Sequence, residues 1–190
     1  MKKLFQFILV VTVITLTFNG CSTGFERDEY GSIISGGTIK AESLRIGDCF
    51  NDLNPEEIKE FAKSIREGDK SATVDVNYVS AVPCNMPHNN EVFAKSASLF
   101  SVLDDEYPSD KELGTRTENF CVPEAYRYLG IDTNLSQSKK ERMFTEAFPN
   151  WYQYLFPTPS FWDTGNRQID CIFYTELATE NSARNLLEKR

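Results

Sequence analysis

The chain has a single histidine, and the residues around it are the first place to look for chemistry. His88 lies in the segment VPCNMPHNNEVF (82–93), four positions after Cys84 and three before Glu91. Imidazole, thiolate and carboxylate groups are the usual ligands of zinc, and imidazole and carboxylate are common general acids and bases. Two readings of this segment follow: a metal or catalytic site centred on His88, and a tight turn between two strands.

The rest of the sequence favours the turn. A zinc site needs three or four ligands, and no second histidine is present. The hydrolase, metalloprotease and nucleotide-binding motifs are absent, and Ser136 and Lys139 form an S-x-x-K pattern without its companion elements. We therefore expect no cofactor and no catalytic residue. In the turn, Pro87 restricts the backbone while His88 and Glu91 hydrogen-bond to nearby backbone groups. Contact of this exposed turn with a partner is the alternative role of His88 and Glu91.

A second candidate surface lies in an aromatic-rich segment, residues 144–162. Most of its aromatic side chains are expected in the core, Trp162 among them. Tyr152 and Tyr154 are the better surface candidates, because exposed tyrosines of an exported protein stack on sugars or form hot spots for a protein partner.

The N-terminus predicts export and anchoring. Two lysines precede a short apolar run, and Phe18, Asn19 and Gly20 lead to Cys21. A charged start followed by a short apolar stretch is typical of a signal peptide. The residues before Cys21 resemble the lipobox of bacterial lipoproteins, with Phe18 where leucine is usual. The resemblance implies cleavage before Cys21 and a lipid on its sulfur. Secretion with a free Cys21, or an uncleaved anchor, are the alternatives.

The acidic composition argues against two classes of partner. Cleavage after residue 20 would remove two lysines, which leaves 18 basic and 28 acidic residues, a net charge of −10. Such a charge is unsuited to nucleic acid and is repelled by anionic lipid surfaces. We therefore expect a protein held on the extracytoplasmic face of the cell membrane by its lipid, with no nucleic-acid partner.

The four cysteines other than Cys21 predict two disulfides. An even number of cysteines in an exported domain is typical of structural bridges, and four cysteines allow three connectivities. Their spacing includes no C-x-x-C pair, so a zinc knuckle or a thioredoxin-like redox site is not expected.

Apolar patterns predict a small single α+β domain with a largely antiparallel sheet and flanking helices. Asn54 and Pro55 begin the clearest helix, residues 54–68. Other helices are expected over 109–118 and 122–129 and after Ser136, with strands over 73–82, 91–100 and 167–177. The regions in chain order are a lipoprotein signal peptide (1–20), a flexible tether (21–42), the folded domain (43–177) and a polar C-terminal tail (178–190).

Spaced residues across this domain resemble the septum-formation domain family of actinobacterial and related Gram-positive envelope proteins. They lie in RIGDCF (45–50), in the Cys-x-x-Pro-His-x-x-Glu-Val of the histidine segment, in ENFCVPEAYRYLGI (118–131) and in PTPSFWDTGNRQIDCIF (157–173). The likeness covers most of residues 44–174. It implies a membrane-tethered envelope protein with a role near cell division or the cell wall, and it implies no reaction.

The segments that carry this resemblance also contain all four remaining cysteines. We expect the pairs Cys49–Cys84 and Cys121–Cys171, because each pair then links two of these segments that stand at successive corners of the domain. The function expected is a non-enzymatic, lipid-anchored extracytoplasmic domain that binds an envelope protein or a wall polymer. The alternatives are an envelope hydrolase or metalloenzyme centred on His88, and a small-ligand-binding lipoprotein.

Overall fold

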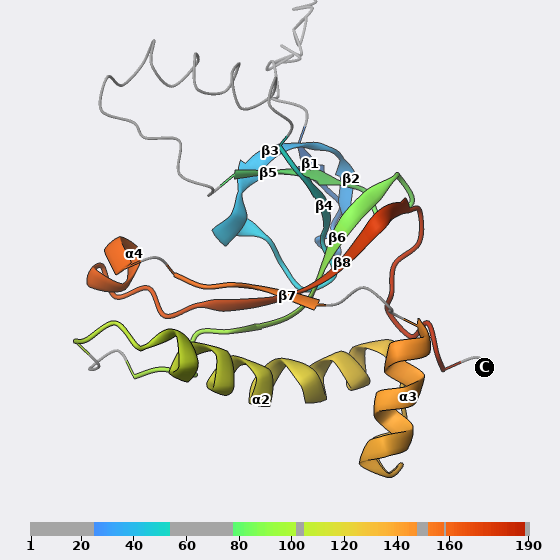
Figure 1. Cartoon of the computed structure of the whole chain (residues 1–190). Coiled ribbons are helices and arrows are strands. Elements are labelled where there is room, and N and C mark those ends of the chain that lie inside the picture. Colours follow the sequence, from blue (N-terminus) through green and yellow to red (C-terminus); the bar gives the residue numbers. More distant parts are fainter. Residues whose placement is uncertain (1–24, 54–77, 102–104, 148–151, 158, 189–190) are drawn as a thin grey trace, which may run out of the picture.

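The computed structural model describes most of the chain beyond the expected signal peptide. The predicted signal peptide, Cys21 and the helix over 54–68 lie outside the described residues, and so does the first part of the strand over 73–82. The described part has the predicted α+β class, with helices packed beside an antiparallel sheet (Figure 1). No helix in it is both long and apolar enough to cross a membrane. The described residues are 25–53, 78–101, 105–147, 152–157 and 159–188.

The main sheet has six strands in the order β3-β5-β4-β6-β8-β7, and every neighbouring pair is antiparallel. The two longest strands, β6 and β8, are neighbours in this sheet and run the length of the domain (Figure 1). A separate two-stranded ribbon precedes the sheet in the chain. The strands are β1 (Glu26–Arg27), β2 (Ile33–Ser35), β3 (Gly37–Lys40), β4 (Cys49–Asp52), β5 (Tyr78–Val82), β6 (His88–Ser96), β7 (Tyr152–Leu155) and β8 (Ile169–Thr179).

The expected flexible tether over 21–42 is wrong for its described part. Strand β3 is an edge strand of the main sheet, and Ile33 and Ile39 are buried. Arg27 reaches Asp48 with two hydrogen bonds, of 2.7 and 2.5 Å. These strands are too short to show an apolar period in the sequence. They form because β3 pairs with β5 and because Arg27 binds Asp48, 21 residues later in the chain.

Helix α2 (Asp110–Leu129) is one continuous helix where two were expected. Ser109 caps its start by accepting a hydrogen bond from the Glu112 N–H, and Gly130 ends it in the left-handed conformation. Pro123 inside a helix removes a backbone hydrogen bond and ordinarily breaks it. Here a buried stripe at four-residue spacing runs on through that point and holds the helix against the sheet: Leu113, Thr117, Cys121, Ala125 and Leu129.

The remaining helices are short. The helix expected after Ser136 is confirmed as α3 (Gln137–Ala147), which begins with the Lys140 N–H bonded to the Ser136 carbonyl. A single turn of 3-10 helix, η1 (Ala41–Ser43), follows β3, and α4 (Pro159–Asp163) lies between β7 and β8. Trp162 of α4 is buried, as expected.

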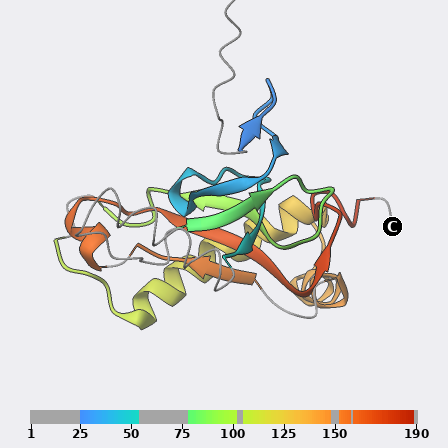
Figure 2. The same ribbon diagram turned by 90° about the horizontal axis from the view of Figure 1, so that it is seen from above.

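Two apolar clusters hold the layers together. The larger one lies between α2 and the β6–β8 face of the sheet, and the turned view shows α2 beneath the strands (Figure 2). The second cluster joins the N-terminal strands to the other side of β6 and β8 through Val92 and Ile172. Neighbouring residues on these strands, such as Val92 and Phe93, therefore face different cores. Both faces of these two strands are buried where they pair, so each has three consecutive buried apolar residues there, Val92–Ala94 and Cys171–Phe173.

The C-terminal tail expected over 178–190 is part of the domain as far as it is described. Strand β8 extends to Thr179, and Ala183 and Leu187 are buried in the larger cluster. The Leu187 N–H bonds to the Leu129 carbonyl at 2.9 Å, at the end of α2. This segment is polar in sequence because only two of its side chains enter the core. Its backbone is held by hydrogen bonds to carbonyl groups at the end of helix α2.

Both expected disulfides are present. Cys49–Cys84 joins β4 to the turn after β5, with 5.2 Å between the Cα atoms, and Cys121–Cys171 joins α2 to β8, with 5.8 Å. Each bridge closes a long loop, of 35 and 50 residues respectively. The second bridge attaches the helix to the sheet two residues before Pro123, which explains in part why the helix continues through the proline.

Candidate functional site

His88 is the first residue of β6 and not part of a turn. The turn lies just before it, where the Met86 N–H bonds to the Pro83 carbonyl at 2.9 Å. The imidazole is 1% exposed, and its Nδ1 lies 2.8 Å from the Met86 carbonyl oxygen. A carbonyl only accepts hydrogen bonds, so Nδ1 carries a proton and donates it to this bond.

The side chain that fastens this turn is Asn51 of β4. Its Nδ2 donates to the Pro87 carbonyl at 3.1 Å, and its Oδ1 accepts from the Asn89 N–H at 2.8 Å. Of the two side chains expected to hold the turn, His88 does bond to a nearby backbone group, the Met86 carbonyl, whereas the expectation for Glu91 is wrong. Asn51 takes that part because its amide donates and accepts at once, and the pairing of β4 with β6 brings it beside the turn.

Glu91 lies on β6 and is buried. Its carboxylate accepts from the Tyr128 hydroxyl at 2.6 Å, the Ser182 hydroxyl at 2.5 Å and the Ala183 N–H at 2.6 Å. Burial, and secondarily the charge of Glu91, raises the pKa of Tyr128 well above its ordinary value. The exposed contact surface expected at His88 and Glu91 is therefore wrong: both side chains are buried, and Glu91 is engaged inside the domain.

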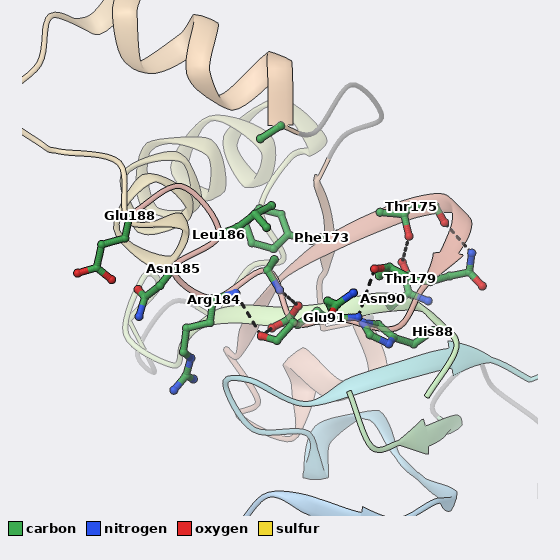
Figure 3. Close-up of a pocket in the computed structure, with 15 residues that line it drawn as sticks. His88, Asn90, Glu91, Phe173, Thr175, Thr179, Arg184, Asn185, Leu186 and Glu188 are labelled. Carbon is green, nitrogen blue, oxygen red and sulfur yellow. Dashed lines mark hydrogen bonds between the residues drawn. The ribbon is translucent and has the colours of Figure 1, made fainter. Parts of the chain in front are cut away.

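A cavity of about 780 Å³ lies beside the start of β6. The start of β6, the end of β8, the last residue of α3 and the C-terminal segment line it (Figure 3). Its size falls within the roughly 300–1,000 Å³ of ordinary small-molecule pockets. Uncharged hydrogen-bonding side chains predominate in its wall, and six of them are Asn89, Asn90, Thr175, Thr179, Asn181 and Asn185.

Two buried polar atoms of lining residues have no hydrogen-bond partner among the described residues. They are Nε2 of His88 and Nδ2 of Asn90, whose residues are 1% and 3% exposed. Leaving a buried polar group unpaired costs about 1–3 kcal/mol, so such groups are rare without a reason. Asn90 was missed by sequence reasoning, because Pro-His-Asn-Asn is also typical of a turn and its place on a buried strand is set by β4 and β8.

The described geometry adds no support for a metal site or a hydrolase centred on His88. In the described part of the chain, the one group of three possible metal ligands is Cys49, Cys84 and Glu91. Two of these ligands are the sulfurs of a disulfide, which cannot bind an ion as thiolates while they are joined. Nε2 of His88 has no partner in the described part of the chain, so no serine or cysteine described there is hydrogen-bonded to it.

The aromatic candidates lie on β7, on the other side of β8 from β6. Tyr154 is half-buried and packs on the larger apolar cluster, with its ring 5.9 Å from that of Phe156. It is therefore less available than expected. Tyr152 pairs with Phe173 in the sheet, and Phe173 pairs in turn with Glu91; the Tyr152 side chain lies outside the description.

Comparisons of this chain with models of protein families, with curated proteins and with solved structures found no match. The likeness to the septum-formation family therefore stays a prediction from spaced residues. The cavity is therefore interpreted from its own geometry.

Proposed function

We propose that this protein is a lipid-anchored domain on the extracytoplasmic face of the cell membrane, and that it binds another envelope component without catalysing a reaction. The signal-like N-terminus and Cys21 support export and anchoring. Two disulfides support an oxidising compartment, because such bonds are rare in proteins of the cytosol. A role in division or wall assembly rests on the family resemblance alone.

The fold bears on how such an anchor would work. The described structure begins at Phe25, four positions after Cys21, so only three residues would separate it from a lipidated Cys21. A chain of that length spans at most about 14 Å. The domain would then sit close to the bilayer, and its ligand would be a component found near the membrane surface.

The observation that carries the binding function is the cavity beside the start of β6, with its predominantly uncharged polar lining. A concave site with a few convergent polar groups is the usual form of a ligand site. This observation favours a compact ligand, or one unit of a wall polymer, over a flat protein surface. Nε2 of His88 has no partner among the described residues, and a general base acts through such an atom, so an enzyme centred on His88 is the second candidate. Conversion of a bound ligand would support it.

Anchoring is tested by mass spectrometry of the protein from membranes. The expected N-terminal peptide begins at Cys21 and carries a diacylglyceryl group. An intact Met1 or an unmodified Cys21 would refute the lipoprotein, and a Cys21→Ala variant retained in membranes would indicate an uncleaved anchor.

Binding is tested by a photo-crosslinking amino acid placed in the intact protein in cells. Leu186 lines the cavity and is 38% exposed, whereas Tyr30 is 86% exposed and lies on the N-terminal ribbon away from it. We expect a discrete adduct from position 186 that position 30 does not give. Equal adducts at both positions, or none at position 186, would contradict a binding role for the cavity.

A further inference from the structure

Strand β7 (Tyr152–Leu155) forms one edge of the main sheet, and β3 forms the other. It pairs with β8 on one side, and no described strand lies on its other side (Figure 2). We propose that this outer edge pairs with the same edge of a second copy of the chain, so that two sheets join across a twofold axis. The pairing goes beyond the binding function proposed above, and it needs neither the cavity nor the lipid on Cys21.

The edge of a sheet is a place where a further strand can add. In an antiparallel pair, each strand also directs backbone N–H and C=O groups away from its partner. An edge strand therefore presents a row of donors and acceptors that another chain can bind. Proteins usually protect such an edge with charged side chains, proline or a bulge, and the two edges of this sheet differ in that protection.

The β3 edge is protected by charge. Strand β3 ends at Lys40, whose side chain is 57% exposed, and Glu42 shortly after it is 48% exposed. Exposed charges on an edge strand, lysine above all, discourage pairing between sheets. The β3 edge is therefore a poor place for a second copy.

The β7 edge has no charge. It lies within residues 147–162, the longest stretch without a charged residue outside the predicted signal peptide. The six residues 151–156 read WYQYLF, and aromatic residues favour strands. A short segment with high β-propensity, no charge and no proline is typical of strands that pair between chains. The sequence of β7 therefore lacks the protection that the β3 edge has.

Strand β7 is held in place by the rest of the domain. Tyr154 packs on the larger apolar cluster and Leu155 on the second one, so both faces of the sheet fix the strand. All four residues of β7 are in register with β8. The edge is therefore formed before a partner arrives, and pairing does not have to order a loop first.

Charge favours a second copy as the partner. The full sequence has a formal net charge of −8, so repulsion opposes contact between two copies except where neither brings charge to the interface. A twofold axis places the same patch on both sides of an interface. The partner strand is then also uncharged and rich in aromatic residues, and aromatic pairs across two strands stabilise an antiparallel sheet.

Crosslinking in cells identifies the partner. A photo-crosslinking amino acid replaces the exposed Gln153 of β7 in the full chain, and the exposed Thr38 of β3 is the matched position on the other edge. We expect a dimer adduct from position 153 whose peptides all come from this protein, and none from position 38. No adduct from position 153, adducts with other proteins only, or equal dimer adducts at both positions would overturn the proposal.

Sedimentation equilibrium of the mature protein in detergent measures the association itself. Gln153→Lys and Gln153→Glu each bring two like charges to the paired strands, so each should raise the dimer dissociation constant about fivefold or more. The two changes alter the net charge in opposite directions, so a shared effect cannot come from overall charge. Thr38→Lys and Thr38→Glu are the controls, and they should leave the constant within about twofold of the wild-type value.

Three results would refute the pairing. One is a wild-type protein that stays monomeric up to about 100 µM, where even weak specific pairs associate. The others are unchanged dissociation constants in both Gln153 variants, and opposite changes that follow the net charge. Because Gln153 is exposed, the melting temperatures of its variants should stay near that of the wild type. The lipid on Cys21 and the crosslinks at position 186 are measured separately and do not depend on these results.

Discussion

The Glu91 carboxylate accepts a hydrogen bond of 2.6 Å from the backbone N–H of Ala183, 92 residues later in the chain. Strand β6 thereby holds the C-terminal segment, which forms one wall of the cavity. The same carboxylate accepts from Tyr128 of α2 and from Ser182. One buried side chain thus joins the central strand, the long helix and the chain end.

The first prediction concerns this junction. Glu91→Ala leaves one buried and two partly buried donors without an acceptor, so we expect the free energy of unfolding to fall by about 3 kcal/mol. Urea denaturation measures it. Glu176→Ala, an exposed carboxylate on β8, should change stability by less than about 0.5 kcal/mol. A loss below about 1 kcal/mol in Glu91→Ala would show that water replaces the carboxylate.

The second prediction concerns the N-terminal ribbon. Arg27 and Asp48 form a two-point ion pair with side chains 13% and 4% exposed. Arg27→Met leaves a buried carboxylate without its cation, which should cost about 3 kcal/mol. The matched control is Lys40→Met, because Lys40 and Glu42 are 57% and 48% exposed and such pairs contribute about 0–1 kcal/mol. Equal stability losses from the two changes would contradict a structural role for the ribbon.

The third prediction is the order in which the disulfides are reduced. Cys84 is half-buried, whereas Cys121 and Cys171 are fully buried. A reductant must reach a sulfur atom, so Cys49–Cys84 should open first under native conditions. Alkylation at increasing times, followed by peptide mass analysis, gives the order. Labelling of Cys121 before Cys84 would contradict it.

The fourth prediction is a pH dependence at Asp170. Burial raises its pKa above the ordinary value of 3.8, although Lys95, with Nζ 3.1 Å away, acts in the opposite direction. The folded state therefore holds this proton more tightly than the unfolded state, and its stabilising effect grows as the pH falls through the raised pKa toward 3.8.

Asp170→Asn has no such proton and serves as the reference. The free energy of unfolding of the wild type minus that of the variant should therefore increase from about pH 7 to about pH 4. Urea denaturation at a series of pH values measures the difference, in which carboxylates common to both proteins cancel. A difference that is flat or falls with acidification would mean that Lys95 dominates and that the pKa is not raised.

Local patterns in the sequence were enough to predict the fold class, the helix after Ser136 and the closing strand. These elements depend on residues close in sequence: a cap, a turn and an apolar period. An even set of cysteines implied two disulfides. The pairing came from the family resemblance, and the structure contains the same pairs.

Other features depend on partners far along the chain, and for these the local sequence was misleading. Residues 25–40 and 178–188 are polar enough to be taken for a tether and a tail, but Asp48, Tyr128 and Leu129 supply the bonds that order them. Pro123 suggested a helix start, yet the buried stripe and the bridge to β8 carry the helix through it.

In the histidine segment, too, local residue types and distant partners determine different features. Its residue types marked it for attention, but its sequence also suits an exposed turn, and only the tertiary structure decided which description holds. Strand pairing with β4 and β8 buries His88, Asn90 and Glu91. Glu91 finds donors on α2 and near the chain end, whereas Nε2 and Nδ2 find no partner among the described residues. Burial and hydrogen-bond satisfaction are set by atoms up to 92 residues away, and no local pattern contains them.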